Sequence, residues 1–217
     1  MDPTSRMTAL LGRMRRERNG AVADTMRCWG RPSGLNYGVS LPTVRQIARA
    51  EGTDHALARL LWQQDVRELR LAALYLADPA RLPEERVFWG AGIANSELAE
   101  EAAFALLSRT DAFAELFRDW IAAPEPLLRY AALLAAARSE RLTIEWLDPV
   151  LEAVRMETDP AAAPWIARGA VAMLAALGAQ NEENRQAVLR ATGSPGKLPA
   201  EDCVHEELAW RLAEAQC

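Results

Sequence analysis

Arg67-Glu-Leu-Arg-Leu-Ala-Ala-Leu-Tyr-Leu-Ala77 is the first of four alanine-rich segments that together determine how this chain folds. The other three segments span residues 97–107, 128–138 and 166–177. The adjacent alanines at 72 and 73 recur at 102 and 103 and at 131 and 132, a spacing of 30 and then 29 residues. Small side chains there allow neighbouring helices to approach closely, while leucines fill the space between them. A fixed period of this length is typical of helical repeat proteins.

A shorter segment with one tryptophan precedes each alanine-rich segment. Trp62, Trp89, Trp120 and Trp146 are spaced 27, 31 and 26 residues apart. Because they recur at equivalent positions, we interpret them as core between repeats rather than as platforms on which a base stacks. No segment alternates apolar and polar residues over the length of a strand. The sequence therefore predicts an all-α fold, an α-solenoid (superhelix) of about six HEAT-like antiparallel helix pairs.

Proline and glycine mark the ends of the expected helices. Pro124 and Pro126 open the third long helix, and Gly178 stands where a C-cap should end the fourth. We predict one repeat domain over 1–217, with basic N-terminal helices over 5–50, core repeats over 51–178 and a terminal capping hairpin over 181–216. The second helix of that hairpin is expected over about 199–215.

Composition excludes several classes of function. No apolar run reaches the roughly 18 residues that a membrane span needs, and residues 1–18 lack the apolar region of a secretory signal. We therefore expect a cytoplasmic protein with no membrane contact. The cysteines, Cys28, Cys203 and Cys217, have no metal-binding spacing, and His55 and His205 lie 150 positions apart. We expect reduced thiols, no metal and no cofactor.

Charge is distributed unevenly along the chain. The net charge is −5, yet residues 1–50 carry nine arginines and only three acidic residues. A basic segment is thus attached to an acidic body. Arginines near the starts of the long helices are candidates for phosphate contacts along a groove, because such contacts need only cations on one face.

The most distinctive stretch is Gly34-Leu-Asn-Tyr-Gly-Val-Ser-Leu-Pro-Thr-Val-Arg-Gln-Ile-Ala48. A serine able to cap and a proline in the first turn predict a helix start. Together with Leu61-Trp62 and Arg67-Glu68-Leu69-Arg70 further on, this stretch resembles the AlkD-like DNA alkylation repair family over roughly residues 10–192. The resemblance implies a solenoid of about six HEAT-like repeats that holds duplex DNA in a concave basic groove. Active members are monofunctional glycosylases that remove cationic alkylpurines.

The chain departs from that family at the implied active site. The family motif Trp-Asp-x-x-Asp matches residues 95–100 here, where Ser96 stands in place of the tryptophan and Glu100 in place of the catalytic aspartate. In the next repeat a family arginine aligns with Tyr130, and a further groove tryptophan aligns near Ala172. The alternative interpretation of Glu97, Glu100 and Glu101 is a solvated helix face with favourable dipole interactions.

Two hypotheses remain open. In the first, the chain binds duplex DNA and excises cationic alkylpurines with Glu100 as the catalytic carboxylate, or only recognises distorted DNA. In the second, it is a catalytically inactive HEAT-repeat scaffold that binds a protein or nucleic acid on its concave face. The candidate DNA contacts are Arg15, Arg16, Arg45, Arg67, Arg70, Arg129, Tyr130 and Arg168.

Overall fold

The computed structural model describes residues 2–28 and 34–214. Within those ranges the chain forms 13 α-helices and no strands, and the model is 70% helical. The β-structure in these ranges is limited to an isolated β-bridge between Leu35 and Val66. The predicted all-α, HEAT-like fold class is therefore confirmed. Cys217 and the side chain of Cys28 lie outside the described residues, whereas Cys203 is an exposed free thiol.

The chain divides into two compact units, residues 1–111 and 112–217. The prediction of one continuous domain, with its three subdivisions, stays a prediction. The first unit contains α1 (Pro3–Arg16), α2 (Gly20–Cys28), α3 (Leu41–Arg49), α4 (His55–Trp62), α5 (Arg67–Leu76), η1 (Pro79–Arg81), α6 (Arg86–Ala91), α7 (Ser96–Ala105) and η2 (Leu107–Arg109). The second contains α8 (Phe113–Ile121), α9 (Pro126–Ala136), η3 (Ile144–Trp146), α10 (Leu147–Arg155), α11 (Ala163–Gly178), α12 (Glu182–Thr192) and α13 (Pro199–Glu214).

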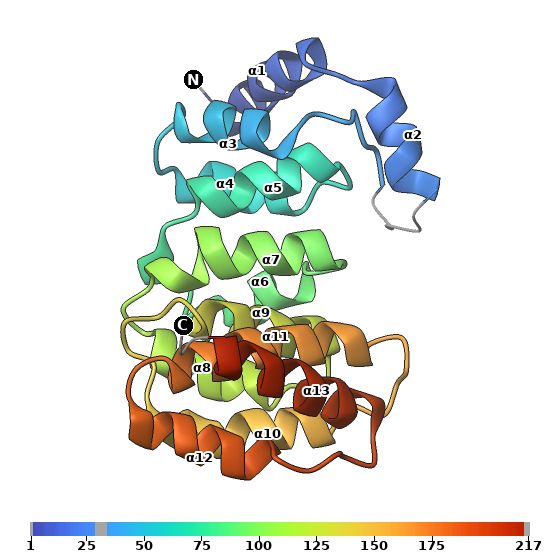
Figure 1. The fold of residues 1–217 in the computed structure, drawn as a ribbon. Coiled ribbons are helices and arrows are strands. Elements are labelled where there is room, and N and C mark those ends of the chain that lie inside the picture. The colour runs from blue at the N-terminus through green and yellow to red at the C-terminus, as the bar shows by residue number, and fades with distance from the viewer. Residues whose placement is uncertain (1, 29–33, 215–217) are drawn as a thin grey trace. The chain divides into compact units, whose positions relative to one another are not determined.

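Helices pair along the chain within each unit, as Figure 1 shows. In the first unit α4 packs on α5, α3 packs on α5, and α5 packs on α7. In the second unit α8 packs on α9 and α10 on α11, and α9, α11 and α13 form the corresponding stack. The second helix of each pair therefore packs on the second helix of the neighbouring pair in the same unit.

Side chains at the helix starts explain where the helices begin. Ser40 caps α3 by accepting a hydrogen bond from the amide of Thr43, as the sequence predicts. Asn95 accepts one from Leu98 at the start of α7, and Pro126 begins α9. The prediction of Gly178 as a C-cap is wrong, because α11 continues through Gly178 and is capped by Ala179. A side chain at Gly178 would approach Leu212 of α13, so the glycine permits close packing instead.

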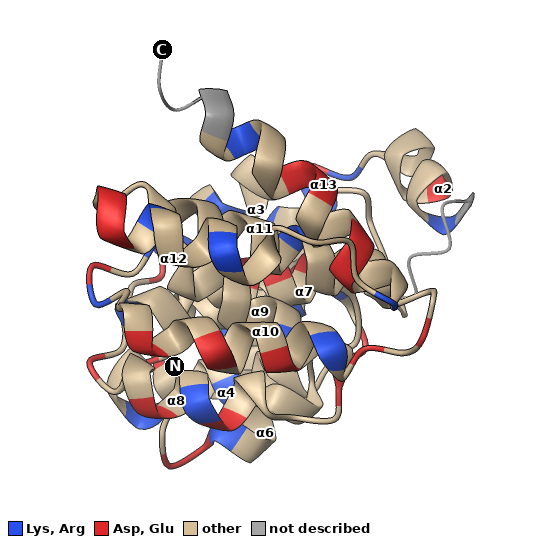
Figure 2. Ribbon diagram, turned by 60° about the horizontal axis from the view of Figure 1, so that its bottom comes forward, with Lys and Arg blue, Asp and Glu red and all other residues tan. Residues whose placement is uncertain are grey.

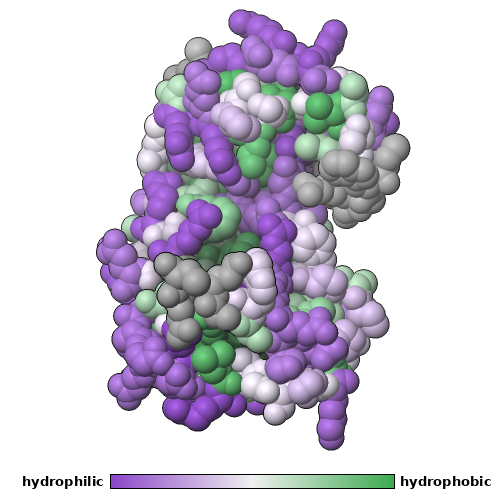
Figure 3. All heavy atoms as spheres, viewed as in Figure 1, coloured by the Kyte–Doolittle hydropathy of each residue, from purple (hydrophilic) through white to green (hydrophobic). Residues whose placement is uncertain are grey.

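The repeated tryptophans and alanines form the cores. Trp62, Trp89, Trp120 and Trp146 are all buried, which confirms that they are core residues. Trp62 and Trp89 pack with ring centroids 5.4 Å apart. The three predicted alanine pairs are buried where the second helices meet. Hydrophilic side chains cover most of the face of each unit that Figure 3 shows, and no helix in the described ranges is long and apolar enough to cross a membrane.

Candidate nucleic-acid interface

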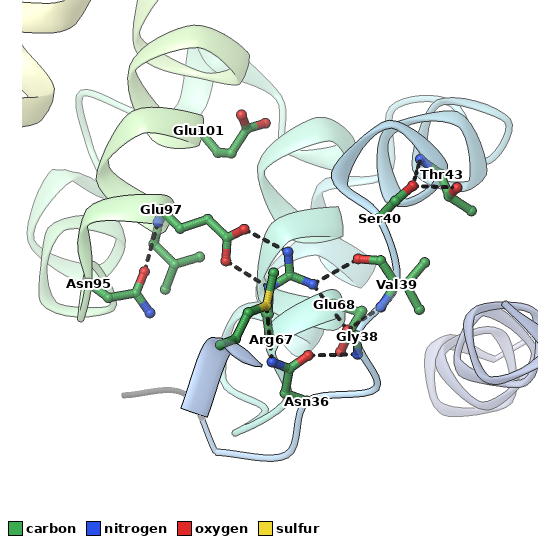
Figure 4. A network of polar contacts seen from close by, with 12 residues as sticks. Asn36, Gly38, Val39, Ser40, Thr43, Arg67, Glu68, Asn95, Glu97 and Glu101 are labelled. Carbon is green, nitrogen blue, oxygen red and sulfur yellow. Dashed lines mark hydrogen bonds and ion pairs between the residues drawn. The ribbon is translucent and has the colours of Figure 1, made fainter. Parts of the chain in front are cut away.

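A buried ion pair joins the first turns of α5 and α7. The Arg67 guanidinium donates through Nε and Nη2 to the two carboxylate oxygens of Glu97, at 2.7 and 2.6 Å. Arg67 is only 4% exposed. Burial by itself would lower the pKa of Arg67, but hydrogen bonds and negative charge from Glu97 and Glu68 raise it overall. Arg67 is therefore buried and charged, and it joins two repeats through its contacts with Glu97 (Figure 4).

The distinctive segment around Tyr37 docks on the residue next to Arg67. The carboxylate of Glu68, which is fully buried, accepts hydrogen bonds from the amides of Tyr37 and Val39 at 3.2 Å each. Arg67 in turn donates to the carbonyl oxygen of Val39 at 2.9 Å. Gly38 between them has a φ of 71°. The segment around Tyr37 and the first turn of α5 thus interlock through these hydrogen bonds, which help to build the first unit (Figure 4).

A second cluster lies further along the same helices. Arg45 of α3 donates from Nε to the Tyr75 hydroxyl at 2.8 Å, and both side chains bond the carboxylate of Glu101 on α7. Burial, followed by the hydrogen bond and charge of Glu101, raises the pKa of Tyr75 well above its ordinary value. The pKa of Arg45 is also raised, chiefly by its hydrogen bond to Glu101. Tyr75 is therefore held in its protonated form, with its ring fixed between α3 and α7.

A pocket of about 270 Å³ opens beside this cluster in the first unit. Its walls come from the end of α3 and the loop that follows, from α5, and from the end of α7 with η2. The guanidinium of Arg49 lies over the Tyr75 ring, 5.4 Å from its centroid. The lining residues are Arg49, Gly52, Thr53, Tyr75, Phe104, Ala105 and Arg109. Sequence reasoning missed this pocket, since it forms at helix ends rather than at the helix starts.

Glu100, the predicted catalytic carboxylate, lies on α7 between Glu97 and Glu101, which are both hydrogen-bonded to arginines. Glu97 is bound by Arg67, and Glu101 is 2% exposed and bound by Arg45 and Tyr75. The interpretation of these three residues as a solvated helix face is therefore wrong for Glu97 and Glu101. Glu100 itself is partly exposed. Helical spacing puts it on the same side of α7 as Glu97 and Phe104, and its catalytic role stays a prediction.

Two of the predicted DNA contacts are buried in the second unit. Arg129 is 3% exposed, donates to the carbonyl oxygens of Ala123 and Pro124, and forms an ion pair with Glu157. Tyr130 is fully buried and packs against Trp165 with ring centroids 5.8 Å apart. Both side chains serve the packing of α9, because each is buried among contacts with other parts of the second unit.

The other predicted contacts differ in how accessible they are. Arg15 and Arg16, at the end of α1, are exposed, and Arg15 lies over the ring of Tyr37 at 5.8 Å. Arg70 is partly exposed and donates to the carbonyl of Gln64 at 2.9 Å, and Arg168 is exposed on α11. The structure therefore brings Arg45 and Arg67 close to the glutamates of α7, and leaves the α1 arginines on the surface.

The two units differ in charge. Residues 1–111 contain 15 arginines and 14 acidic residues, whereas residues 112–217 contain 10 basic and 16 acidic residues. Figure 2 marks acidic residues along α10 and α13. In the described part of the chain no group of three or more His, Cys, Asp or Glu side chains is placed to hold a metal ion. The first unit is therefore the better candidate for contact with a polyanion.

Helix pairs that stack through their second helices, with Arg–Glu ion pairs between repeats, define a HEAT-like repeat protein. The family model for the DNA alkylation repair enzyme matches residues 10–197, so the chain belongs to that family. No curated protein matches the sequence. This membership confirms the resemblance seen in the sequence and supports a role in DNA binding or DNA repair.

A solved structure shares the fold along nearly the whole chain. It is described as "a new family of proteins related to the HEAT-like repeat DNA glycosylases with affinity for branched DNA structures". The TM-score is 0.71 at 15% sequence identity, and the match covers 98% of this chain and 96% of the other. At that identity the likeness establishes the fold. Three expectations stay predictions: a cytoplasmic location, the absence of a cofactor, and a protein partner on the concave face.

Proposed function

We propose that this chain binds DNA through the basic surface of its first unit. The observation that carries the proposal is the group of exposed arginines at and just after the end of α1, namely Arg15, Arg16 and Arg18. Lys and Arg side chains that neutralise phosphates release condensed counterions, and this supplies most of the affinity of non-specific DNA binding. The family supports the same role.

The set of phosphate contacts proposed here is narrower than the sequence suggested. Arg67 and Arg129 are buried and ion-paired, so they act by holding repeats together. Arg45 keeps 36% of its side chain exposed, but its guanidinium is bound to Glu101. Its function here is to position Tyr75. We assign direct contacts with DNA phosphates to Arg15, Arg16 and Arg18 in the first unit. Whether Arg70 and Arg168 also contact phosphates is a question for mutagenesis.

Branched DNA belongs among the ligands to be tested, because a protein of similar fold is described by its affinity for such structures. The experiment is a titration of labelled duplex and three-way-junction DNA with the full chain, at several salt concentrations. We expect binding that weakens steeply with salt for both ligands. Arg15→Gln with Arg16→Gln should reduce it, whereas the exposed pair Arg118→Gln with Arg190→Gln should not. Absence of binding at low salt would support the scaffold hypothesis instead.

Excision of cationic alkylpurines is the second candidate function, and one observation favours it. Glu100 stands at the position of the family's catalytic aspartate, and its side chain is partly exposed on α7. A cationic purine leaves without protonation, so what catalysis requires is stabilisation of positive charge at the sugar and a positioned water. One carboxylate can do both. We infer that Glu100 would perform this step on any lesion the protein excises.

The test for excision is release of 7-methylguanine from methylated duplex. Replacing Glu100 by Gln should reduce the rate by about 10²–10³ with DNA affinity nearly unchanged. Glu84→Gln, a change of the same kind at an exposed position of the first unit, serves as the control. Equal rates for wild type and Glu100→Gln would remove Glu100 from the mechanism. If wild type releases no base while still binding DNA, the protein is a DNA-binding member without glycosylase activity.

A further inference from the structure

The pocket between α3, α5 and α7 combines two features that no packing role requires. Arg49 and Arg109 stand at its rim with exposed side chains, and among the described residues neither forms an ion pair. By contrast, nearby Arg6, Arg13 and Arg45 are each bound to a carboxylate. Two uncompensated guanidiniums at one opening create a local attraction for an anion.

The walls of the pocket also offer aromatic surface. Phe104 is partly exposed on α7, and Tyr75 lines the same pocket with Arg49 over its ring. Aromatic rings and the planes of arginine side chains are the groups on which proteins stack unpaired bases. A site with both cations and rings therefore matches a ligand that has both a phosphate and a base.

Contacts behind the pocket hold its walls in place. The hydroxyl of Tyr75 is fixed by Arg45 and Glu101, and Arg109 donates to the carbonyl of Ala105 at 3.0 Å, which restrains its guanidinium at the rim. Gly52 has a φ of 72°, a conformation that other residues rarely adopt, so the loop after α3 turns sharply to form one edge. A binding site with preset walls loses less free energy to ordering when a ligand enters.

We propose that this pocket binds one nucleoside phosphate, with the phosphate between Arg49 and Arg109 and the base against Phe104. Its volume of about 270 Å³ is just below the usual range of ligand pockets, which favours a single nucleotide over a larger ligand. The source of that nucleotide is then an unpaired position at a branch, gap or end of DNA, and in this respect the proposal rests on the proposed function. A free mononucleotide shares the same chemistry and is distinguished by experiment.

The test measures affinity of the full chain for two DNA ligands of equal length, a blunt duplex and a duplex with a short single-stranded flap. Wild type should prefer the flap by about tenfold, the effect of stacking one base. Arg109→Gln and Phe104→Leu should each bring flap affinity close to that of blunt duplex, and leave blunt-duplex affinity unchanged. Arg81→Gln and Phe88→Leu, matched changes elsewhere in the first unit, should keep the preference. Thermal melts of each variant confirm that the fold is intact.

Competition with deoxyadenosine monophosphate completes the design. If the mononucleotide binds wild type but not Arg109→Gln, and no flap preference exists, the pocket takes free nucleotides and the DNA source is wrong. If the pocket variants behave like wild type with all three ligands, the proposal is overturned, even when duplex binding persists. If no DNA binds at low salt, the proposed function fails independently of the pocket.

Discussion

At the scale of single residues, the buried carboxylate of Glu68 explains why the segment around Tyr37 is distinctive. An isolated charge in the core is strongly destabilising unless it is paired and hydrogen-bonded. Glu68 receives two backbone amides and the guanidinium of Arg67, so its charge is compensated inside the fold. A segment of the chain that supplies amides to a carboxylate must keep one particular backbone path, and Gly38 makes that path accessible.

Replacing Gly38 by alanine should therefore destabilise the first unit. A Cβ at this position would lie 2.0 Å from the carbonyl oxygen of Asn19, and the positive φ is unfavourable for alanine. We expect a loss of more than about 1 kcal/mol in the free energy of unfolding. Gly12, within α1, has nothing near its would-be Cβ, so Gly12→Ala should instead stabilise by about 0.5–1 kcal/mol. Urea denaturation of both variants measures the contrast, and equal effects would contradict it.

Glu85 provides a prediction about pH. Burial by itself would raise the pKa of Glu85, but hydrogen bonds from His55, Arg59 and Trp89 outweigh burial and hold it below its ordinary value. A carboxyl with a depressed pKa stabilises the fold above its unfolded pKa, and that contribution is lost as pH falls through the folded value. The stability advantage of wild type over Glu85→Gln should thus be constant near neutrality and shrink below about pH 5.

The measurement is chemical denaturation of wild type and Glu85→Gln between neutral pH and pH 3. Glu84→Gln is the control, since Glu84 is its exposed neighbour. A difference between wild type and Glu85→Gln that does not change with pH would mean that packing, rather than charge, accounts for the role of Glu85.

At the scale of elements, an arginine in the first turn of a second helix binds a glutamate one repeat further on. Arg67 pairs with Glu97, 30 residues later, and Arg129 pairs with Glu157, 28 residues later. In both cases the guanidinium also donates to backbone carbonyls, at Val39 and at Ala123 and Pro124. These ties fix how one helix pair sits on the next within each unit.

A double-mutant cycle on Arg129 and Glu157 tests this role. Removing either partner leaves a buried charge without compensation, so Arg129→Met and Glu157→Gln should each cost about 3–5 kcal/mol. The double variant should be less destabilised than the sum of the two, because the partners share one interaction. The exposed pair of Glu207 and Arg211 on α13 is the control, and its coupling should be only about 0.3–0.5 kcal/mol. Additive losses at Arg129 and Glu157 would contradict the tie.

Much of the fold follows from periodicity, since the alanine pairs and tryptophans recur wherever a core position recurs. The same periodicity could not say whether Arg67 and Arg129 face solvent or the next repeat, because a recurring arginine suits either place. A signal was present in the sequence: the separation of each arginine from its glutamate, 30 and 28 residues, is close to the length of one repeat. The pocket was less accessible to prediction, as Arg49, Phe104 and Arg109 come together only through the loop after α3 and the end of α7.

At the scale of the whole molecule, the chain carries two units of opposite character. Arginines slightly outnumber acids in residues 1–111, and acids outnumber bases by six in residues 112–217. A polyanion such as DNA is attracted to the first and repelled by the second, and both effects weaken with salt. Affinity for DNA should therefore depend on where a charge is removed, and not only on net charge.

The last prediction follows from that asymmetry. Arg15→Gln with Arg16→Gln, and Arg118→Gln with Arg190→Gln, each remove two exposed positive charges, the first pair from α1 and the second from α8 and α12. If the α1 arginines neutralise phosphates, the first double variant should lower the slope of log K against log salt by about 1.8, or 0.9 for each contact. The second should leave the slope unchanged, because Arg118 and Arg190 are not among the proposed phosphate contacts. Duplex titrations between low and physiological salt give both slopes. Equal reductions would show that DNA responds to net charge alone, and an unchanged slope in the first variant would move the interface away from α1.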